Sequence, residues 1–277
     1  MKGGPEGRFT RRTPRIVAAA KLRRRRDRER AGQFLAEGPQ AVREALARSG
    51  AVRELFLTER AGQRHPDLTT AARAAGVPVS WITEDAAGAL TETVTPQGVV
   101  AVCEHLDRPL ATVLRGRPRL VAVLVEVAEP GNAGTVLRTA DAAGAQAVVF
   151  AGAAVDPYNG KCVRASAGSL FHLDLVRHPE PTTALAQLRG AGLRVLAATG
   201  HGETDLDHLA DAGALAAPTA WVFGSEAHGL PAAVLTEADD RVRVPIHGRA
   251  ESLNLGAAAA VCLYASARAQ REERRTP

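Results

Sequence analysis

The fold is decided by the stretch Trp221-Val222-Phe223-Gly224-Ser225-Glu226-Ala227-His228-Gly229-Leu230, in which a hydrophobic strand runs directly into a polar loop with two glycines. About twenty residues later a second polar loop follows a strand, at Ile246-His247-Gly248-Arg249-Ala250-Glu251-Ser252-Leu253-Asn254-Leu255. A third stretch, Glu129-Pro130-Gly131-Asn132-Ala133-Gly134-Thr135-Val136-Leu137-Arg138-Thr139-Ala140, has the same order of strand, loop and helix. Ligands of α/β domains bind in loops at the carboxyl ends of strands. The three stretches therefore predict one ligand site.

The rest of the chain predicts two α/β domains. Residues 120–127 form a near-continuous aliphatic run, as strands buried on both faces do, and strands alternating with helices predict a parallel, doubly wound sheet. Its further strands are expected at 147–151, 173–176, 193–198, 220–223 and 242–245. A smaller α/β domain is expected before it, with strands at 33–36, 52–57, 77–81 and 98–103 and a helix at 39–49. We therefore divide the chain into a basic segment 1–30, a first α/β domain 14–104, a linker 105–118 and a second α/β domain 119–277.

Composition narrows the class of protein. A chain of 277 residues with 45% hydrophobic and 23% charged residues is long enough for two ordinary globular domains, each with its own hydrophobic core. No apolar run approaches the ~18 residues of a membrane span, and the start of the chain leads into arginines, so a cytoplasmic protein is expected. The odd number of cysteines, Cys103, Cys162 and Cys262, in no metal-like spacing, predicts small buried thiols and no metal site.

Positive charge is concentrated at the N-terminus. Residues 1–30 hold twelve Lys or Arg against three acids, a net charge of +9, whereas the whole chain carries +5, which leaves −4 for the remainder. Guanidinium groups bind phosphate oxygens bidentately, and several such contacts give salt-dependent affinity for nucleic acid. We expect this basic segment to bind a polyanion; a solvated, frayed terminus is the alternative.

Each motif taken alone has a structural explanation. Asn132 is expected to cap the helix that follows it, and Arg138 lies within reach of that turn or serves as a surface cation. The loop after Gly224 can present backbone donors and acceptors to a small ligand, but it lacks the Lys-Ser/Thr of a phosphate loop. Ser252 fits a cap of the last helix, and the small residues at 256–260 permit close helix packing.

Their conjunction, in this order and together with Arg164-Ala165-Ser166-Ala167-Gly168, resembles the SpoU (TrmH-like) family of RNA 2'-O-ribose methyltransferases in the SPOUT superfamily. The resemblance covers most of residues 120–270. More weakly, Phe34-Leu35-Ala36-Glu37-Gly38 and the basic helix before it resemble that family's L30e-like RNA-binding module. The resemblance implies a trefoil-knotted homodimer that binds S-adenosylmethionine in the knot.

The resemblance also implies roles for residues at matching positions. Arg138 would act at the target ribose, with Asn132, Glu226, Ser252 and Asn254 assembling the catalytic site. The cofactor would contact Thr199, Gly200, Phe223, Gly224, Ile246, Ser252, Leu253 and Leu255, and RNA would contact Arg23, Arg24, Arg25, Arg26 and Arg164. A guanidinium holds its proton firmly, so we favour electrostatic stabilisation by Arg138, with Arg138 as the base as the alternative.

RNA is the expected substrate because it carries the 2'-hydroxyl, and the two-domain form resembles the ribosomal RNA branch of the family, with 23S rRNA as the favoured target. Transfer RNA is one alternative substrate. A non-catalytic RNA-binding factor in ribosome assembly is a rival function, although Asn132, Arg138, Glu226 and Asn254 are all present. A dinucleotide-dependent enzyme is disfavoured, since no G-x-G-x-x-G with a suitably spaced acid follows a strand.

Overall fold

The computed structural model describes residues 7–273, so the predicted basic segment and second α/β domain each extend a few residues beyond it. The chain divides into two compact units. The first contains the described residues up to Leu106 together with Asp156–His172. The second contains Asp107–Val155 and the described residues from Leu173 onward.

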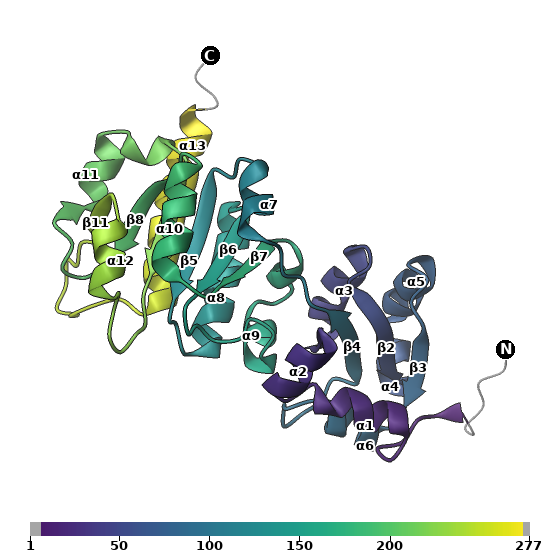
Figure 1. The fold of residues 1–277 in the computed structure, drawn as a ribbon. Coiled ribbons are helices and arrows are strands. Elements are labelled where there is room, and N and C mark those ends of the chain that lie inside the picture. Colours follow the sequence, from purple (N-terminus) through teal and green to yellow (C-terminus); the bar gives the residue numbers. More distant parts are fainter. Residues whose placement is uncertain (1–6, 274–277) are drawn as a thin grey trace. The chain divides into compact units, whose positions relative to one another are not determined.

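The first unit is a four-stranded sheet with short helices, in the order β1-β4-β2-β3 (Figure 1). β1 and β2 both run antiparallel to β4, and β3 runs parallel to β2. The elements are α1 (Pro14–Lys21), α2 (Arg25–Ala31), β1 (Gln33–Glu37), α3 (Pro39–Ala47), β2 (Val52–Thr58), α4 (Glu59–Arg64), α5 (Pro66–Ala74), β3 (Val79–Ile82), α6 (Glu84–Leu90) and β4 (Val99–Glu104). All four strands expected from the sequence are present.

The basic stretch is two short helices rather than one. α1 ends at Lys21 and α2 begins at Arg25, and Ile16 of α1 is completely buried in the core of the first unit. On α2, Arg28 is buried too. The segment is therefore part of the folded unit in addition to carrying charge.

The first unit also contains a segment from the middle of the chain. Asp156–His172, with α9 (Gly160–Ala165) and the 3-10 helix η2 (Ser169–Phe171), lies inside the range 119–277 expected for the second α/β domain but packs with the first unit. The Tyr158 hydroxyl accepts a hydrogen bond from the backbone N of Leu106 at 2.6 Å, and its ring stacks on His105 with centroids 4.2 Å apart. Local sequence patterns do not indicate these buried contacts, because the residues that make them are far apart in the chain.

The second unit contains a parallel sheet of seven strands within residues 7–273, in the order β7-β6-β5-β10-β8-β11-β9. Its strands are β5 (Leu120–Val125), β6 (Ala147–Ala151), β7 (Asp174–His178), β8 (Arg194–Ala198), β9 (Thr204–Asp205), β10 (Thr219–Phe223) and β11 (Asp240–Arg243). Its helices are α7 (Leu110–Arg115), α8 (Pro130–Ala143), α10 (Pro181–Gly190), α11 (Leu206–Asp211), the 3-10 helix η3 (Ala214–Ala216), α12 (Ala232–Glu237) and α13 (Leu255–Glu273). The predicted parallel α/β sheet is confirmed; the two-residue β9 is too short to produce a sequence signal.

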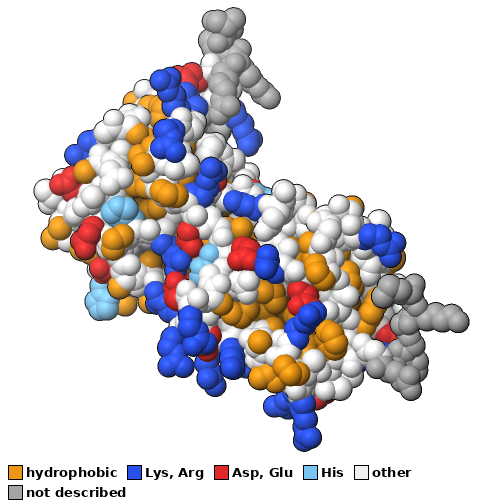
Figure 2. All heavy atoms as spheres, turned by 45° about the vertical axis from the view of Figure 1, so that its right-hand side comes forward, with side chains coloured by type: hydrophobic (Ala, Val, Ile, Leu, Met, Phe, Trp, Pro, Cys, Tyr) orange, Lys and Arg blue, Asp and Glu red, His pale blue; other side chains and the backbone are white. Residues whose placement is uncertain are grey.

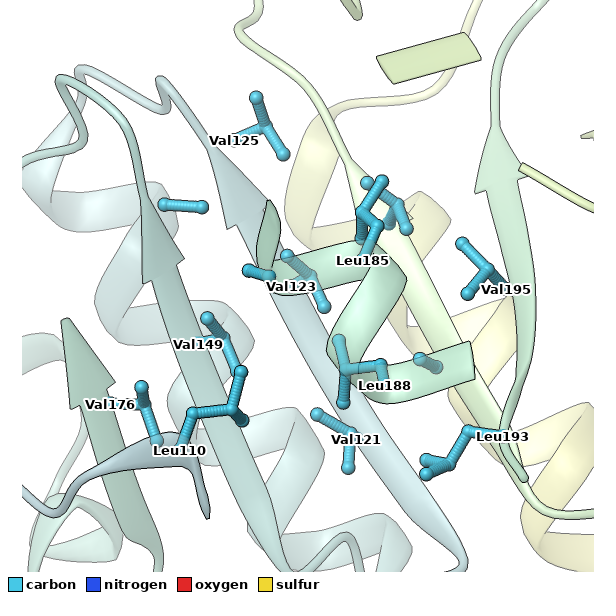
Figure 3. Close-up of a cluster of buried hydrophobic side chains, with 14 of the residues drawn as sticks. Leu110, Val121, Val123, Val125, Val149, Val176, Leu185, Leu188, Leu193 and Val195 are labelled. Atoms are coloured by element: carbon cyan, nitrogen blue, oxygen red, sulfur yellow. The ribbon is translucent and has the colours of Figure 1, made fainter. Parts of the chain in front are cut away.

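Helices cover both faces of this sheet, which explains why its strands are hydrophobic throughout. On one face Val121 and Val123 pack beneath Leu185 and Leu188 of α10, together with α7 (Figure 3). On the other face Trp221 is completely buried, and its indole Nε1 donates to Ser266 Oγ of α13 at 2.9 Å. The core fixes the strand ends that carry the motifs.

The predicted linker contains the helix α7, whose Leu110 and Val113 are buried in the core of the second unit. Its charged residues obscured the helical period in the sequence. No helix within residues 7–273 has the length and apolar character needed to cross a membrane.

Candidate functional site

A cavity of about 440 Å³ opens at the carboxyl ends of β8, β10 and β11 in the second unit. It lies where loops at strand ends were expected to form a site. All eight residues predicted to contact a cofactor line it, as do Glu226 and Asn254. The lining residues are Ala198, Thr199, Gly200, Phe223, Gly224, Ser225, Glu226, Gly229, Leu230, Val242, Val244, Ile246, Glu251, Ser252, Leu253, Asn254, Leu255 and Ala258.

The loop after β10 is closed by its own backbone. The amide of Gly229 donates to the carbonyl oxygen of Ser225 at 2.8 Å, and Gly229 adopts a φ of +68°, which favours glycine. A Cβ on Gly224 would lie 2.4 Å from the Gly229 carbonyl oxygen. Glycine at 224 is thus required by the close approach of two backbone segments at the cavity wall.

The Thr199–Gly200 side of the cavity is held against β11. The backbone N of Thr199 donates to the carbonyl oxygen of Val242 at 2.9 Å. Arg243 donates to the carbonyl oxygen of Gly202 at 3.1 Å and pairs with Asp205 at 3.2 Å. The loop is therefore held by a main-chain hydrogen bond at Thr199 and by the Arg243 side chain at Gly202 and Asp205.

Asn132 joins the three motifs instead of capping a helix. Its Nδ2 donates to Glu226 Oε1 at 2.6 Å, and its Oδ1 accepts from Asn254 Nδ2 at 3.3 Å. The cap of α8 is Glu129, whose carboxylate accepts from the backbone N of Gly131 at 3.1 Å. The prediction that Asn132 caps this helix was wrong, because the helix begins at Pro130, before Asn132.

The last helix is capped by Asn254 rather than by Ser252. Asn254 Oδ1 accepts from the backbone N of Gly256 at 2.9 Å, at the start of α13. A Cβ on Gly256 would lie 2.7 Å from Thr135 Cγ2 of α8, so the two helices are in close contact there. Ser252 lines the cavity and is exposed.

Arg138 is exposed on α8, about two turns from its first residue, and is not among the residues that line the cavity. It makes no hydrogen bond or ion pair with another residue in the described range 7–273. Its guanidinium is therefore available to a partner outside this part of the chain.

The predicted RNA contacts all belong to the first unit. Arg23, Arg24, Arg25 and Arg26 are exposed, and Arg23 lies 3.9 Å from Glu92. Arg164 is half-buried and pairs with Glu37 at 3.4 Å.

Arg28, in the same basic run, has a different role that the sequence did not indicate. Its Nη2 lies 2.6 Å from Asp156 Oδ2, and both side chains are 4% exposed. Its Nη1 donates to the carbonyl oxygens of Leu22 and Arg23 at 3.0 and 2.9 Å. Arg28 thus attaches α2 to the Asp156–His172 segment.

The cysteines are buried, as predicted, and burial raises the pKa of all three thiols, that of Cys262 to about 12. Such thiols are poor nucleophiles at neutral pH. Within residues 7–273 no three His, Cys, Asp or Glu side chains gather in a way that could hold a metal ion.

Comparison with known proteins identifies both parts of the chain. Residues 119–264 match the SpoU rRNA Methylase family, and residues 13–101 match the MRM3-like substrate binding domain. The 23S rRNA (guanosine(2553)-2'-O)-methyltransferase RlmP of Bacillus subtilis is 36% identical over 88% of this chain and 92% of that protein. The 23S rRNA (uridine(2479)-2'-O)-methyltransferase of Streptomyces viridochromogenes is 33% identical over 90% of this chain and 87% of its own length.

Solved structures agree with this comparison. The SpoU methyltransferase AviRb from Streptomyces viridochromogenes in complex with the cofactor AdoMet superimposes with a TM-score of 0.81 at 31% identity, covering 94% of this chain and 100% of that one. The AdoMet-bound rRNA methyltransferase from Sinorhizobium meliloti gives a TM-score of 0.77 at 28% identity, covering 92% and 95%. Both alignments include residues of each unit.

Proposed function

Because the chain belongs to the SpoU rRNA methylase family, we propose that it transfers a methyl group from S-adenosylmethionine to a ribose 2'-hydroxyl of 23S ribosomal RNA. The observation that carries this proposal is the convergence of Asn132, Glu226 and Asn254, from three separate motifs, beside a cavity at the strand ends. A protein that only bound RNA would not need this arrangement.

The cavity suits the cofactor. Its volume of about 440 Å³ is within the range of small-molecule sites, and its wall combines apolar side chains with backbone from two glycine-containing loops. The charged side chains that line it, Glu226 and Glu251, are both acids, which complements a cation. We assign cofactor contacts to Thr199, Gly200, Phe223, Gly224, Ile246, Ser252, Leu253 and Leu255.

When bound, S-adenosylmethionine supplies a methyl group on a positively charged sulfur. The protein must hold the ribose hydroxyl in line with that methyl and stabilise the negative charge that develops on its oxygen. We assign the second role to Arg138, whose guanidinium is unpaired among the described residues. The hydrogen bonds from Asn132 to Glu226 and from Asn254 to Asn132 keep the three loops in register around the reacting groups.

The first unit would hold the RNA. Its match to a substrate-binding domain supports this role, and Figure 2 shows Lys and Arg side chains standing out from the face that it draws. We assign phosphate contacts to four exposed arginines, Arg23, Arg24, Arg25 and Arg26. We also assign one to Arg164, although Arg164 forms an ion pair with Glu37.

We also propose that the protein is a homodimer, that the second unit carries the trefoil knot of its family, and that it works in the cytoplasm. Exposed apolar side chains on α13 support the dimer: Val261 is 42% and Tyr264 49% exposed, three residues apart on one face of the helix. Tyr264→Arg should then shift the sedimentation coefficient to that of a monomer. The control that stays dimeric is Arg115→Gln, an exposed residue of α7 on the other face of the sheet. A dimer that persists in Tyr264→Arg would remove α13 from the interface.

The function is tested by incubating the protein with ribosomal RNA and S-adenosylmethionine labelled in the methyl group. A methylated 2'-hydroxyl cannot attack the adjacent phosphodiester, so the modified nucleotide should be read as one gap in an alkaline cleavage ladder. Label in transfer RNA instead would correct the substrate. Absence of label in both RNAs, with RNA binding intact, would favour the non-catalytic assembly factor.

A further inference from the structure

Two acidic side chains line the cavity, and one of them, Glu251, has no hydrogen bond or ion pair with another side chain among the described residues. Glu226 accepts a 2.6 Å hydrogen bond from Asn132, so its carboxylate is part of the network that joins the motifs. Glu251 also lines the cavity, is exposed, and makes no hydrogen bond or ion pair with any other residue described between 7 and 273. No Lys, Arg or His is among the lining residues to neutralise it.

The position of Glu251 is restricted although its segment has no regular structure. The segment between the end of β11 at Arg243 and the start of α13 at Leu255 is held at both ends. Val242 accepts from the backbone N of Thr199 at 2.9 Å, and Asn254 caps α13 through a 2.9 Å bond to Gly256. Glu251 is three residues before that cap, so its backbone is tethered beside the cavity that it lines.

The methyl donor and its product differ in charge at one atom. S-adenosylmethionine carries a positive sulfonium, whereas S-adenosylhomocysteine, left after methyl transfer, carries a neutral thioether; their adenosine and amino-acid parts are identical. We infer that Glu251 is a specificity-determining residue that makes the cavity prefer the cationic donor over its neutral product. Repulsion between Glu251 and the ligand carboxylate is the same for both and cancels in the comparison. This inference rests on the proposed assignment of the cavity to the cofactor.

The consequence is a bias in the reaction cycle. Once the methyl group has left, the attraction between the sulfonium and the carboxylate is lost, so the product is released more readily and fresh donor displaces it. A unit charge a few ångströms away at a hydrated site is worth about a fivefold change in affinity. The effect should weaken as added salt screens the exposed carboxylate.

The test is calorimetric binding of both ligands to Glu251→Gln, which removes the charge and keeps the shape. The affinity for S-adenosylmethionine should fall about fivefold while that for S-adenosylhomocysteine stays within twofold of the unmodified protein. Sinefungin, which carries an ammonium in place of the methylated sulfonium, should follow S-adenosylmethionine. Glu251→Asp keeps the charge and should keep most of the preference.

The matched control is Glu203→Gln. Glu203 belongs to the neighbouring loop and pairs with Arg241 at 3.1 Å, and it does not line the cavity, so removing its charge should leave the ratio of the two affinities unchanged. Equal losses for both ligands in Glu251→Gln, or no loss for either, would overturn the inference. Failure of the cavity assignment has a different signature: Gly224→Ala, which deforms the cavity wall, would bind S-adenosylmethionine as tightly as the unmodified protein.

Discussion

Gly224→Ala is the most direct test of the cavity, because the added methyl group has nowhere to go. Its Cβ would lie 2.4 Å from the carbonyl oxygen of Gly229 and 2.7 Å from the backbone N of Leu230. Both are main-chain atoms, so no change of rotamer relieves the contact. Ordinary van der Waals contact begins at 3.4 Å, and the loop at 225–229 must therefore move by about 1 Å.

A displacement of that size acts on the cavity wall itself, since Ser225, Glu226 and Gly229 all line it. A backbone group displaced by about 1 Å loses its hydrogen bond to a ligand, and a polar group left unpaired costs about 1–3 kcal/mol, or about 5- to 150-fold in affinity. We therefore expect the affinity for S-adenosylmethionine to fall about a hundredfold, and overpacking to lower the free energy of unfolding by about 1–3 kcal/mol. RNA affinity should not change, because the predicted RNA contacts belong to the first unit.

The assay is isothermal calorimetry with S-adenosylmethionine, accompanied by thermal unfolding and RNA binding. Gly200→Ala is the matched control: Gly200 also lines the cavity, but a Cβ there meets no atom within 4 Å. Unchanged affinity in Gly224→Ala would refute the assignment of this loop to the cofactor. Equal losses in both variants would show that any added methyl blocks the ligand and that displacement of the loop is not the cause.

Three further predictions concern catalysis, RNA and stability. Arg138→Ala should reduce methyl transfer, measured with labelled cofactor, by about a hundredfold or more, while the cofactor affinity measured by calorimetry and the helix content stay unchanged. Mixing Arg138→Ala with Gly224→Ala should restore part of the activity if one site draws on both subunits. Replacing the exposed Arg24–Arg26 together with Gln should lower the slope of log affinity against log salt by about 2 to 3, whereas an unchanged slope would mean that these arginines are merely solvated. Asp156→Asn leaves the buried Arg28 without its counter-charge and should destabilise the protein by about 3–5 kcal/mol in urea unfolding; a change under 1 kcal/mol would contradict a structural role for the pair.

The structure also changes how the RNA role should be tested. Deleting residues 1–30 would remove the most charge, but it would also remove Ile16 from the core and break the pair between Arg28 and Asp156. A loss of RNA binding in such a deletion could arise from unfolding of the first unit. Substituting exposed arginines separates charge from folding.

The sequence predicted the strands of the parallel sheet because burial on both faces leaves long apolar runs that end abruptly in glycine and polar residues. The geometry of such a sheet predicted that those loops meet at one edge, and the resemblance to the SpoU family supplied the cofactor residues within them. The sequence could not predict that Asp156–His172 packs with the first unit. That choice depends on Tyr158 stacking on His105 and on Arg28 meeting Asp156, pairs that are far apart in the chain.

The prediction of side-chain roles failed where one residue type could fill either of two roles. Asparagine is common both as a helix cap and as a bridge between loops, and local sequence favoured the cap for Asn132. In the structure Glu129 caps α8, Asn132 bridges the loops, and Asn254 both caps α13 and donates to Asn132. The signal that could have separated the two roles is the proline at 130, since proline favours the first turn and places the cap at the residue before it.

The position of Arg138 leaves open which site its guanidinium serves. Its neighbours in the motif order, Asn132, Glu226 and Asn254, are joined by hydrogen bonds within one chain, yet Arg138 lies about two turns along α8, outside the cavity lining. An exposed guanidinium is well hydrated, and without a partner in the described residues it stays available to a site that must stabilise negative charge. It can serve that site either after the RNA arrives or from a second subunit. The second alternative depends on the proposed homodimer, whose candidate contacts are the exposed Val261 and Tyr264 on α13, the helix that packs directly against α8.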